Sequence, residues 1–108
     1  MATTTTTVNE LNSLTVTATF LDINDNPYIP QGLSWRLWDD TNKMMLQDWQ
    51  TLTPDFSVQW EIPGALNTID NVNNLTERHM VLLQTIIPGG EVRYDNAYYN
   101  VIAVPDIG

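Results

Sequence analysis

The sequence contains no cysteine, so neither a disulfide nor a thiolate metal site can hold the fold together. It also has no apolar run near the roughly 18 residues that a membrane-spanning helix requires. The amino terminus lacks the basic start and the apolar stretch of a signal peptide. We therefore expect a chain that is made in a cytoplasm, neither crosses a membrane nor carries an export signal, and folds by burial of apolar side chains.

Basic residues are scarce. Four Lys and Arg stand against 13 Asp and Glu, and the resulting net charge of −9 is spread along the chain. Such a surface repels nucleic acid phosphates and anionic lipid headgroups, so we expect neither nucleic acid nor a membrane as partner. The charge either keeps the protein soluble or complements a basic partner.

The groups of common catalytic sites are missing as well. His79 is the only histidine, and a lone histidine at the head of a predicted strand is typically a surface or packed side chain. The neighbouring carboxylates Asp39 and Asp40 lie in a predicted turn, where adjacent side chains seldom converge. No phosphate-binding glycine loop or histidine-based metal motif is present. The sequence therefore predicts no enzyme, no cofactor and no metal.

What the sequence does contain is short segments of alternating polarity in a 108-residue chain that fits one domain. The predicted strands begin near residues 14, 33, 43, 56, 79 and 91, and turn signals rich in Asx, Pro or Gly separate most of them. Residues 65–77 are expected to form a crossover with at most one helical turn. Six or seven strands without a long helix predict an all-β sandwich of two sheets, with a small barrel as the alternative.

Strand phase predicts which side chains face the core. Leu33, Trp35 and Leu37 should point inward, and Ser34, Arg36 and Trp38 outward. The phase is irregular over residues 43–49, which favours a bulge or an edge strand. Residues 79–87 are apolar on both faces, as in a central strand covered on both sides. Residues 91–104 change phase near Asp95, which predicts a bulge or two strands.

The first 12 residues include five consecutive threonines and little to bury, so they predict a flexible arm ahead of a domain over residues 13–108. Because threonine favours strands, the arm could instead pair as an extra strand with a partner. Thr5, Thr6 and Thr7 are therefore candidate partner-binding residues.

Four apolar side chains fall at positions with polar or irregular phase, namely Trp38, Met44, Met45 and Trp49. Indole and thioether side chains on a solvated face are typical of protein interfaces. These residues are candidates for a partner-binding surface, and filling of the core is the alternative interpretation.

The segment Asp22-Ile23-Asn24-Asp25-Asn26-Pro27 resembles the calcium-binding linker of cadherins. It differs because it follows the first predicted strand, and no matching acidic triplets occur elsewhere. An Asx-rich hairpin turn explains the same residues, and calcium binding remains the other hypothesis.

The chain from residue 14 to about residue 104 resembles small immunoglobulin-like proteins of tailed bacteriophages. The resemblance is carried by Thr19-Phe20-Leu21-Asp22, Asn26-Pro27, Pro30, Ser34-Trp35-Arg36-Leu37, Leu46-Gln47-Asp48-Trp49, Ile62-Pro63 and Glu77-Arg78. It implies an immunoglobulin-like two-sheet sandwich with an extended N-terminal arm, and a structural role in a virion.

The implied function is that of a capsid decoration or cement protein on the shell formed by the major capsid protein. A neck or tail structural protein is one alternative, and a module that binds a host-surface glycan or protein is the other. The expected partners are the major capsid protein, other virion proteins or a second copy of the chain. The expected location is the virion, with the capsid surface favoured over the tail.

Overall fold

The computed structural model describes residues 6–71 and 73–104, and its regular secondary structure is almost entirely β-strand. The strands are β1 (Thr6–Asn9), β2 (Leu14–Thr19), β3 (Gly32–Asp39), β4 (Met44–Thr51), β5 (Ser57–Ile62), β6 (Thr76–Ile86) and β7 (Val92–Ile102). One short 3-10 helix, η1 (Gly64–Leu66), follows β5. This agrees with the prediction of at most one helical turn in the crossover.

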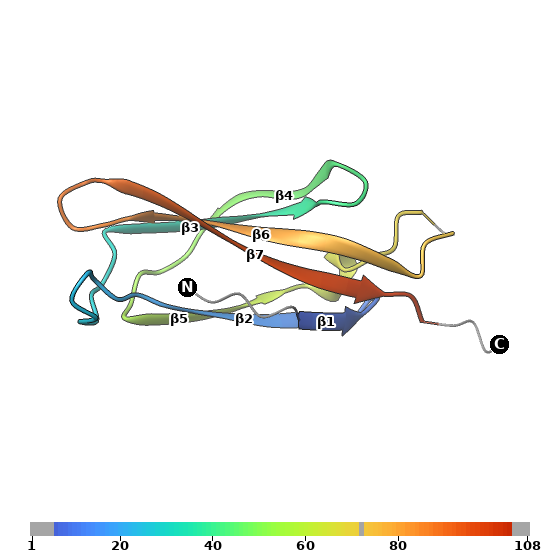
Figure 1. Cartoon of the computed structure of the whole chain (residues 1–108), viewed down its shortest axis with the longest axis horizontal. Helices are drawn as coiled ribbons and strands as arrows, with labels where there is room; N and C mark the ends of the chain where they lie inside the picture. Colours follow the sequence, from blue (N-terminus) through green and yellow to red (C-terminus); the bar gives the residue numbers. More distant parts are fainter. Residues whose placement is uncertain (1–5, 72, 105–108) are drawn as a thin grey trace.

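The strands form two sheets that pack as a sandwich (Figure 1). The larger sheet has the order β1-β7-β6-β3-β4, and the smaller sheet contains only β2 and β5. All pairs are antiparallel except β1 with β7, which is parallel. The predicted all-β sandwich is therefore confirmed.

Alternation along β3 builds the centre of the core. Leu33, Trp35 and Leu37 are buried, whereas Ser34, Arg36 and Trp38 are only partly buried on the opposite face of the sheet, as predicted. The buried apolar residues come from both sheets and the segments beside them: Ala18, Phe20, Leu33, Trp35, Leu37, Val58, Ile62, Val81, Leu83, Tyr99 and Val101. The core therefore lies between the inner faces of the two sheets.

The predicted turns are also present. Asp22 Oδ1 accepts hydrogen bonds from the backbone N–H groups of Asn24 and Asn26, at 2.8 and 2.9 Å, which is the geometry of an Asx-rich turn. Gly89 and Gly90 join β6 to β7 with φ of 106° and 94°, a region that residues with a Cβ rarely adopt. The Asx and Gly residues at these two turns are therefore explained by the backbone conformation that each turn requires.

Of three expectations for individual strands, two need revision and one is confirmed. Strand β7 is a single strand whose register with β6 runs without a shift from Val92 to Ile102, so the predicted bulge or division is wrong. Strand β4 is an edge strand with an irregular register against β3, as its phase predicted. Strand β6 is central, but the second sheet covers only its inner face.

The amino-terminal arm differs from the expected flexible segment. Residues 6–9 form β1, whose backbone pairs with β7 from Thr6 opposite Tyr99 to Asn9 opposite Ile102. Leu11 and Asn12 are also fixed, because Leu11 N–H donates to Asn67 O and Asn12 O accepts from Asn67 Nδ2. Long-range backbone pairing thus outweighs the polar composition of this segment, and residues 1–5 lie outside the described residues.

Gly64 allows this amino-terminal segment to approach η1 closely. A Cβ at residue 64 would lie 2.2 Å from Leu11 O, and a backbone oxygen cannot rotate away. We expect Gly64→Ala to lower the free energy of unfolding by about 2 to 3 kcal/mol because the two segments must separate. Gly89→Ala should cost only about 1 kcal/mol, since no atom lies within 4 Å and only its positive φ is strained. Urea unfolding of both variants checks this ranking, and equal losses would contradict the close-approach argument.

No helix in the described part of the chain is long and apolar enough to span a membrane.

Candidate functional site

The two outer faces of the sandwich differ in chemistry. The outer face of the small sheet is polar, with Thr15, Thr17 and Thr19 on β2 exposed opposite Glu61, Gln59 and Ser57 on β5. The outer face of the large sheet is rich in aromatic and sulfur-containing side chains. An exposed polar sheet face suits water, whereas an aromatic sheet face is typical of a surface that another molecule covers.

We call this second surface the outer sheet face and define it by nine side chains. They are Arg36 and Trp38 on β3, Met45 and Trp49 on β4, Arg78, Met80 and Leu82 on β6, and Tyr94 and Tyr98 on β7. Those on β3 and β6 alternate with buried core residues, and the strand register places Tyr98 beside Met80 and Met45 beside Trp38.

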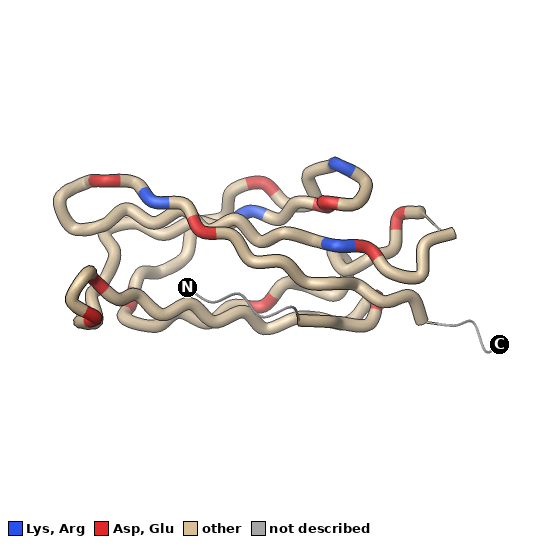
Figure 2. The backbone as a smooth tube through the Cα atoms, viewed as in Figure 1, with Lys and Arg blue, Asp and Glu red and all other residues tan. Residues whose placement is uncertain are grey.

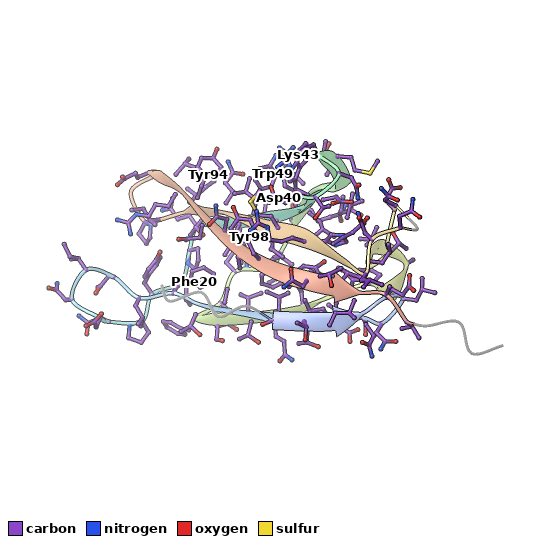
Figure 3. All side chains as sticks on the ribbon, turned by 45° about the vertical axis from the view of Figure 1, so that its right-hand side comes forward. Phe20, Asp40, Lys43, Trp49, Tyr94 and Tyr98 are labelled. Carbon is purple, nitrogen blue, oxygen red and sulfur yellow. The ribbon has the colours of Figure 1, made fainter. Side chains whose placement is uncertain are left out.

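Cation–π contacts order the aromatic rings on this face. The Arg36 guanidinium lies 5.4 Å from the centroid of the Trp49 ring, whose centroid is in turn 6.5 Å from that of Tyr94. Tyr94 Oη accepts a hydrogen bond from Gln84 Nε2 at 3.1 Å. Figure 3 shows Trp49 and Tyr94 on the side of the large sheet that faces away from β2 and β5. The rings are therefore held in place before any partner arrives, which lowers the entropic cost of binding.

A second group of contacts lies toward the β3–β4 hairpin. The Arg78 guanidinium lies 4.8 Å from the Tyr98 ring centroid, and Arg78 Nε donates to Asp40 Oδ2 at 2.9 Å. Lys43 Nζ lies 3.3 Å from Asp40 Oδ1. The hydrogen bond from Arg78, together with Lys43, holds the pKa of the Asp40 carboxyl below its usual value although partial burial opposes this. Asp40 is thus ionised at neutral pH and fixes the position of Arg78.

Charge is also distributed unequally between the sheets (Figure 2). All four basic residues belong to the large sheet or its hairpin: Arg36, Lys43, Arg78 and Arg93. The small sheet and its adjoining turns carry acidic residues such as Asp22, Asp25, Asp55 and Glu61. The large sheet and its turns also carry acidic residues, namely Asp39, Asp40, Asp48, Glu77, Glu91 and Asp95. In a chain of net charge −9, the two sheets therefore differ in their basic residues, which partly compensate the acidic residues of the large sheet alone.

Three of the seven residues predicted from the sequence, Trp38, Met45 and Trp49, meet on this face. Trp38 and Met45 are cross-strand partners, and Trp49 stacks in the cluster with Arg36. Met44 does not belong to the face, since it pairs with Asp39, whose side chain points inward, and it is exposed at the hairpin edge. Thr6 and Thr7 are exposed residues of β1, and Thr5 lies outside the described residues. A partner-binding role for the threonines stays a prediction.

Sequence reasoning missed Tyr94, Tyr98 and the outward residues of β6. A signal was present, because Arg78, Met80 and Leu82 alternate with the residues that face the core. Apolar residues on both faces of residues 79–87 were interpreted as coverage by protein on both sides. The even-numbered positions in fact form an open face.

The described residues also contain a groove of about 620 Å³ at the edge of the sandwich, lined by the Asx turn and β7. Its charged groups are Asp22, Asp25, Arg93 and Asp95, and its hydroxyl groups are those of Thr17, Thr19, Thr85 and Tyr28. No histidine or cysteine lies among these lining residues, so they contain no nucleophile paired with a histidine base. The groove therefore supports a functional assignment less well than the outer sheet face does.

No protein-family model matches the chain, and neither a curated protein nor a solved structure matches it.

Proposed function

We propose that the protein is a non-enzymatic structural protein of a phage virion, a capsid decoration or cement protein that docks through its outer sheet face on the major capsid protein shell. The observation that carries the docking surface is the contrast between two outer faces of one sandwich. One face is Thr, Ser, Gln and Glu, and the other is Trp, Tyr, Met and Arg. Trp, Tyr and Arg are the residues that dominate binding energy at protein interfaces.

The dimensions of the molecule suit such a role. The body measures about 53 × 21 × 20 Å, and its long faces are the faces of the sheets. The area of one long face exceeds the roughly 800 Å² per partner of a standard protein interface. Docking by this face would turn the polar, acidic small sheet toward the solvent.

The proposed fold family is immunoglobulin-like. The order β7-β6-β3-β4, opposite β2-β5, corresponds to strands G, F, C and C′ opposite B and E of a variable-type immunoglobulin domain. Trp35 on β3 occupies the strand that carries the buried tryptophan in that fold, and it packs against Trp60, with ring centroids 6.1 Å apart. Apolar packing takes the place of the missing disulfide. Together with the phage-like sequence pattern, this order supports a virion protein.

The proposal is tested by rebinding to particles. The protein should be present in washed virions, and particles stripped of it should rebind the purified chain. We expect the double variant Trp49→Ala/Tyr98→Ala to bind at least about 100-fold more weakly, because each truncation of an interface aromatic typically costs tenfold or more. The matched control is Thr17→Ala/Gln59→Ala on the outer face of the small sheet, which should bind like the wild type.

Each outcome decides between the functions. Loss of binding in the control but not in the Trp49/Tyr98 variant would contradict the assigned face. Absence of the chain from washed virions would contradict any structural role. Rebinding confined to necks or tails would move the function to those assemblies, and binding to host cells through Trp38 and Trp49 would favour a recognition module.

A further inference from the structure

A second cluster of polar side chains lies inside the sandwich and is separate from the outer sheet face. Asp39, Glu77 and His79 project from the inner faces of β3 and β6 and are 1%, 0% and 0% exposed. One His79 ring nitrogen and one oxygen of each carboxylate lie within 4.8 Å of one another. Ionisable groups buried at this depth require compensating partners.

The Glu77 carboxylate is fixed by the loop before β6. Oε1 accepts from the backbone N–H of Asp70 at 2.8 Å. Oε2 accepts from the backbone N–H of Asn71 at 3.0 Å and from Asn74 Nδ2 at 2.9 Å. Because all these donors are N–H groups, the loop holds the ionised carboxylate. A hydrogen bond from the Asn42 side chain also lowers the pKa of this carboxylate. A metal ion would therefore share the roughly four lone-pair sites of the carboxylate with these donors.

The Asp39 carboxylate is fixed in the same way by the β3–β4 hairpin. Oδ1 accepts from the backbone N–H groups of Thr41 and Asn42 at 3.1 and 3.0 Å. Oδ2 accepts from Asn42 Nδ2 at 2.8 Å and keeps a free lone-pair site. Two buried, anchored carboxylates therefore bring negative charge to one point beside His79.

Hydrogen-bond directions determine the tautomer of His79. Asn67 Nδ2 donates to Asn12 O at 2.8 Å, so Asn67 Oδ1 is the atom that faces Tyr99 and accepts its hydroxyl proton at 2.7 Å. The hydroxyl has no second proton, so its 3.2 Å contact with His79 Nδ1 requires Nδ1–H to donate. The neutral imidazole then carries its lone pair on Nε2, which is buried without a hydrogen-bond partner among the described residues.

The strand register shows which residues flank His79. Tyr99 on β7 and Asp39 on β3 are the cross-strand neighbours of His79 on its two sides. Because Nδ1 contacts Tyr99, the unpartnered Nε2 is the ring nitrogen that remains available as a ligand beside the two carboxylates. A lone pair facing two carboxylates is unfavourable unless a positive charge lies between them. A histidine whose other ring N–H is held by an oxygen is also the usual arrangement of a metal ligand.

We propose that Asp39, Glu77 and His79 bind one divalent transition-metal ion of the Zn²⁺ class. Imidazole nitrogen favours such ions over Ca²⁺ and Mg²⁺, and Zn²⁺ accepts both His nitrogen and Asp or Glu oxygen as ligands. The ion's two positive charges balance those of the two carboxylates. The three side chains leave the fourth position of a tetrahedral ion for water. Because the ligands are anchored by the β3–β4 hairpin and by the loop before β6, the ion would join these two segments to the sheet.

The experiment uses the full chain, treated with a chelator, exchanged into buffer at pH 7.5 and titrated with Zn²⁺ alone. We expect one ion per chain by calorimetry and a melting temperature that rises by at least about 5 °C at saturating zinc, because only the folded state offers the site. His79→Gln should abolish both effects. Tyr99→Phe, which removes the acceptor for Nδ1–H, should weaken zinc binding by about 10-fold to 100-fold. Asp22→Asn in the exposed Asx turn is the matched control and should leave binding unchanged.

Nitrogen-15 NMR of the wild-type imidazole keeps the proposal testable if His79→Gln does not fold. A large shift of Nε2 alone on addition of zinc would support the site. The proposal is overturned if zinc produces no stabilisation and Nε2 carries a proton, which would make His79 a donor to the carboxylates. An equal rise in melting temperature for wild type and His79→Gln would also overturn it, because the zinc would then bind elsewhere.

Discussion

Replacing Trp35 by alanine is expected to lower the free energy of unfolding by about 3 to 5 kcal/mol, most of the stability of a domain of this size. Trp35 is 6% exposed, lies between the two sheets and packs against Trp60. Its removal leaves a cavity at the point where β2 and β5 meet the large sheet. Without a disulfide, no covalent link offsets the loss.

Trp38, on the same strand, provides a matched comparison for the loss of stability in Trp35→Ala. Trp38 points to the outer sheet face and is only partly buried, so Trp38→Ala should cost about 1 kcal/mol or less in unfolding free energy. Binding to particles should show the opposite order. Trp38→Ala should bind more weakly than the wild type, and any Trp35→Ala protein that folds should bind like the wild type. Urea unfolding together with the rebinding assay checks both. A loss of stability for Trp38→Ala as large as that for Trp35→Ala would assign the outer indoles to the core instead.

Replacing Glu77 by glutamine is expected to cost about 2 to 4 kcal/mol, measured in chelator so that metal binding does not contribute. The carboxylate accepts three hydrogen bonds from the loop before β6. The amide replaces one of its two oxygens with an NH₂ group that faces N–H donors. Glu61→Gln, on the exposed face of β5, is the matched control and should change stability by no more than about 0.5 kcal/mol.

The same carboxylate predicts a dependence on pH. Burial raises the pKa of Glu77, but hydrogen bonds from Asn71, Asn74 and Asp70 outweigh it and hold the pKa below the usual 4.5. A lowered folded-state pKa contributes stability that is fully present above pH 4.5 and is lost as the pH falls through the folded-state pKa. The difference in stability between wild type and Glu77→Gln should therefore narrow below pH 4.5 and be constant above it. A difference that widens with acidification would contradict the sign of this argument.

The sheet architecture could be predicted where one face of a strand is buried and the other polar. Leu33, Trp35 and Leu37 alternate with polar or amphipathic residues, so their phase alone identified the core face of β3. Where both faces are apolar, as in β6, phase cannot tell a second layer of the same protein from an open surface. The sequence therefore predicts that a second layer of the protein covers Met80 and Leu82, whereas the structure leaves them on the outer sheet face.

The pairing of β1 and the outer sheet face depend on contacts between distant segments. Thr6 lies opposite Tyr99, more than 90 residues away in the chain, and composition alone favoured a flexible arm. Trp49 was selected because its phase was irregular, but its neighbours Arg36 and Tyr94 come from two other strands. The phase of residues 91–104 is irregular in the sequence, so it does not place Tyr94 and Tyr98 on one face. The continuous register of β7 with β6 does place them there.

The buried cluster shows the same limit more sharply. Asp39 and Asp40 are adjacent in the sequence, but Asp39 is buried and caps a hairpin, whereas Asp40 pairs with Arg78 at the surface. His79 is the only histidine, and its significance depends on Tyr99 and Asn67, which are 20 and 12 residues away. No local motif encodes that arrangement, because it results from strand register.

The measurement that tests the central claim most directly is cryo-electron microscopy of virions of the phage proposed to carry this chain. We predict repeated copies of the sandwich on the capsid shell, with Trp38, Trp49, Tyr94 and Tyr98 buried against the shell protein and the threonines of β2 facing solvent. Copies that dock by the small sheet and leave the aromatic face open would contradict the account, as would particles without this density.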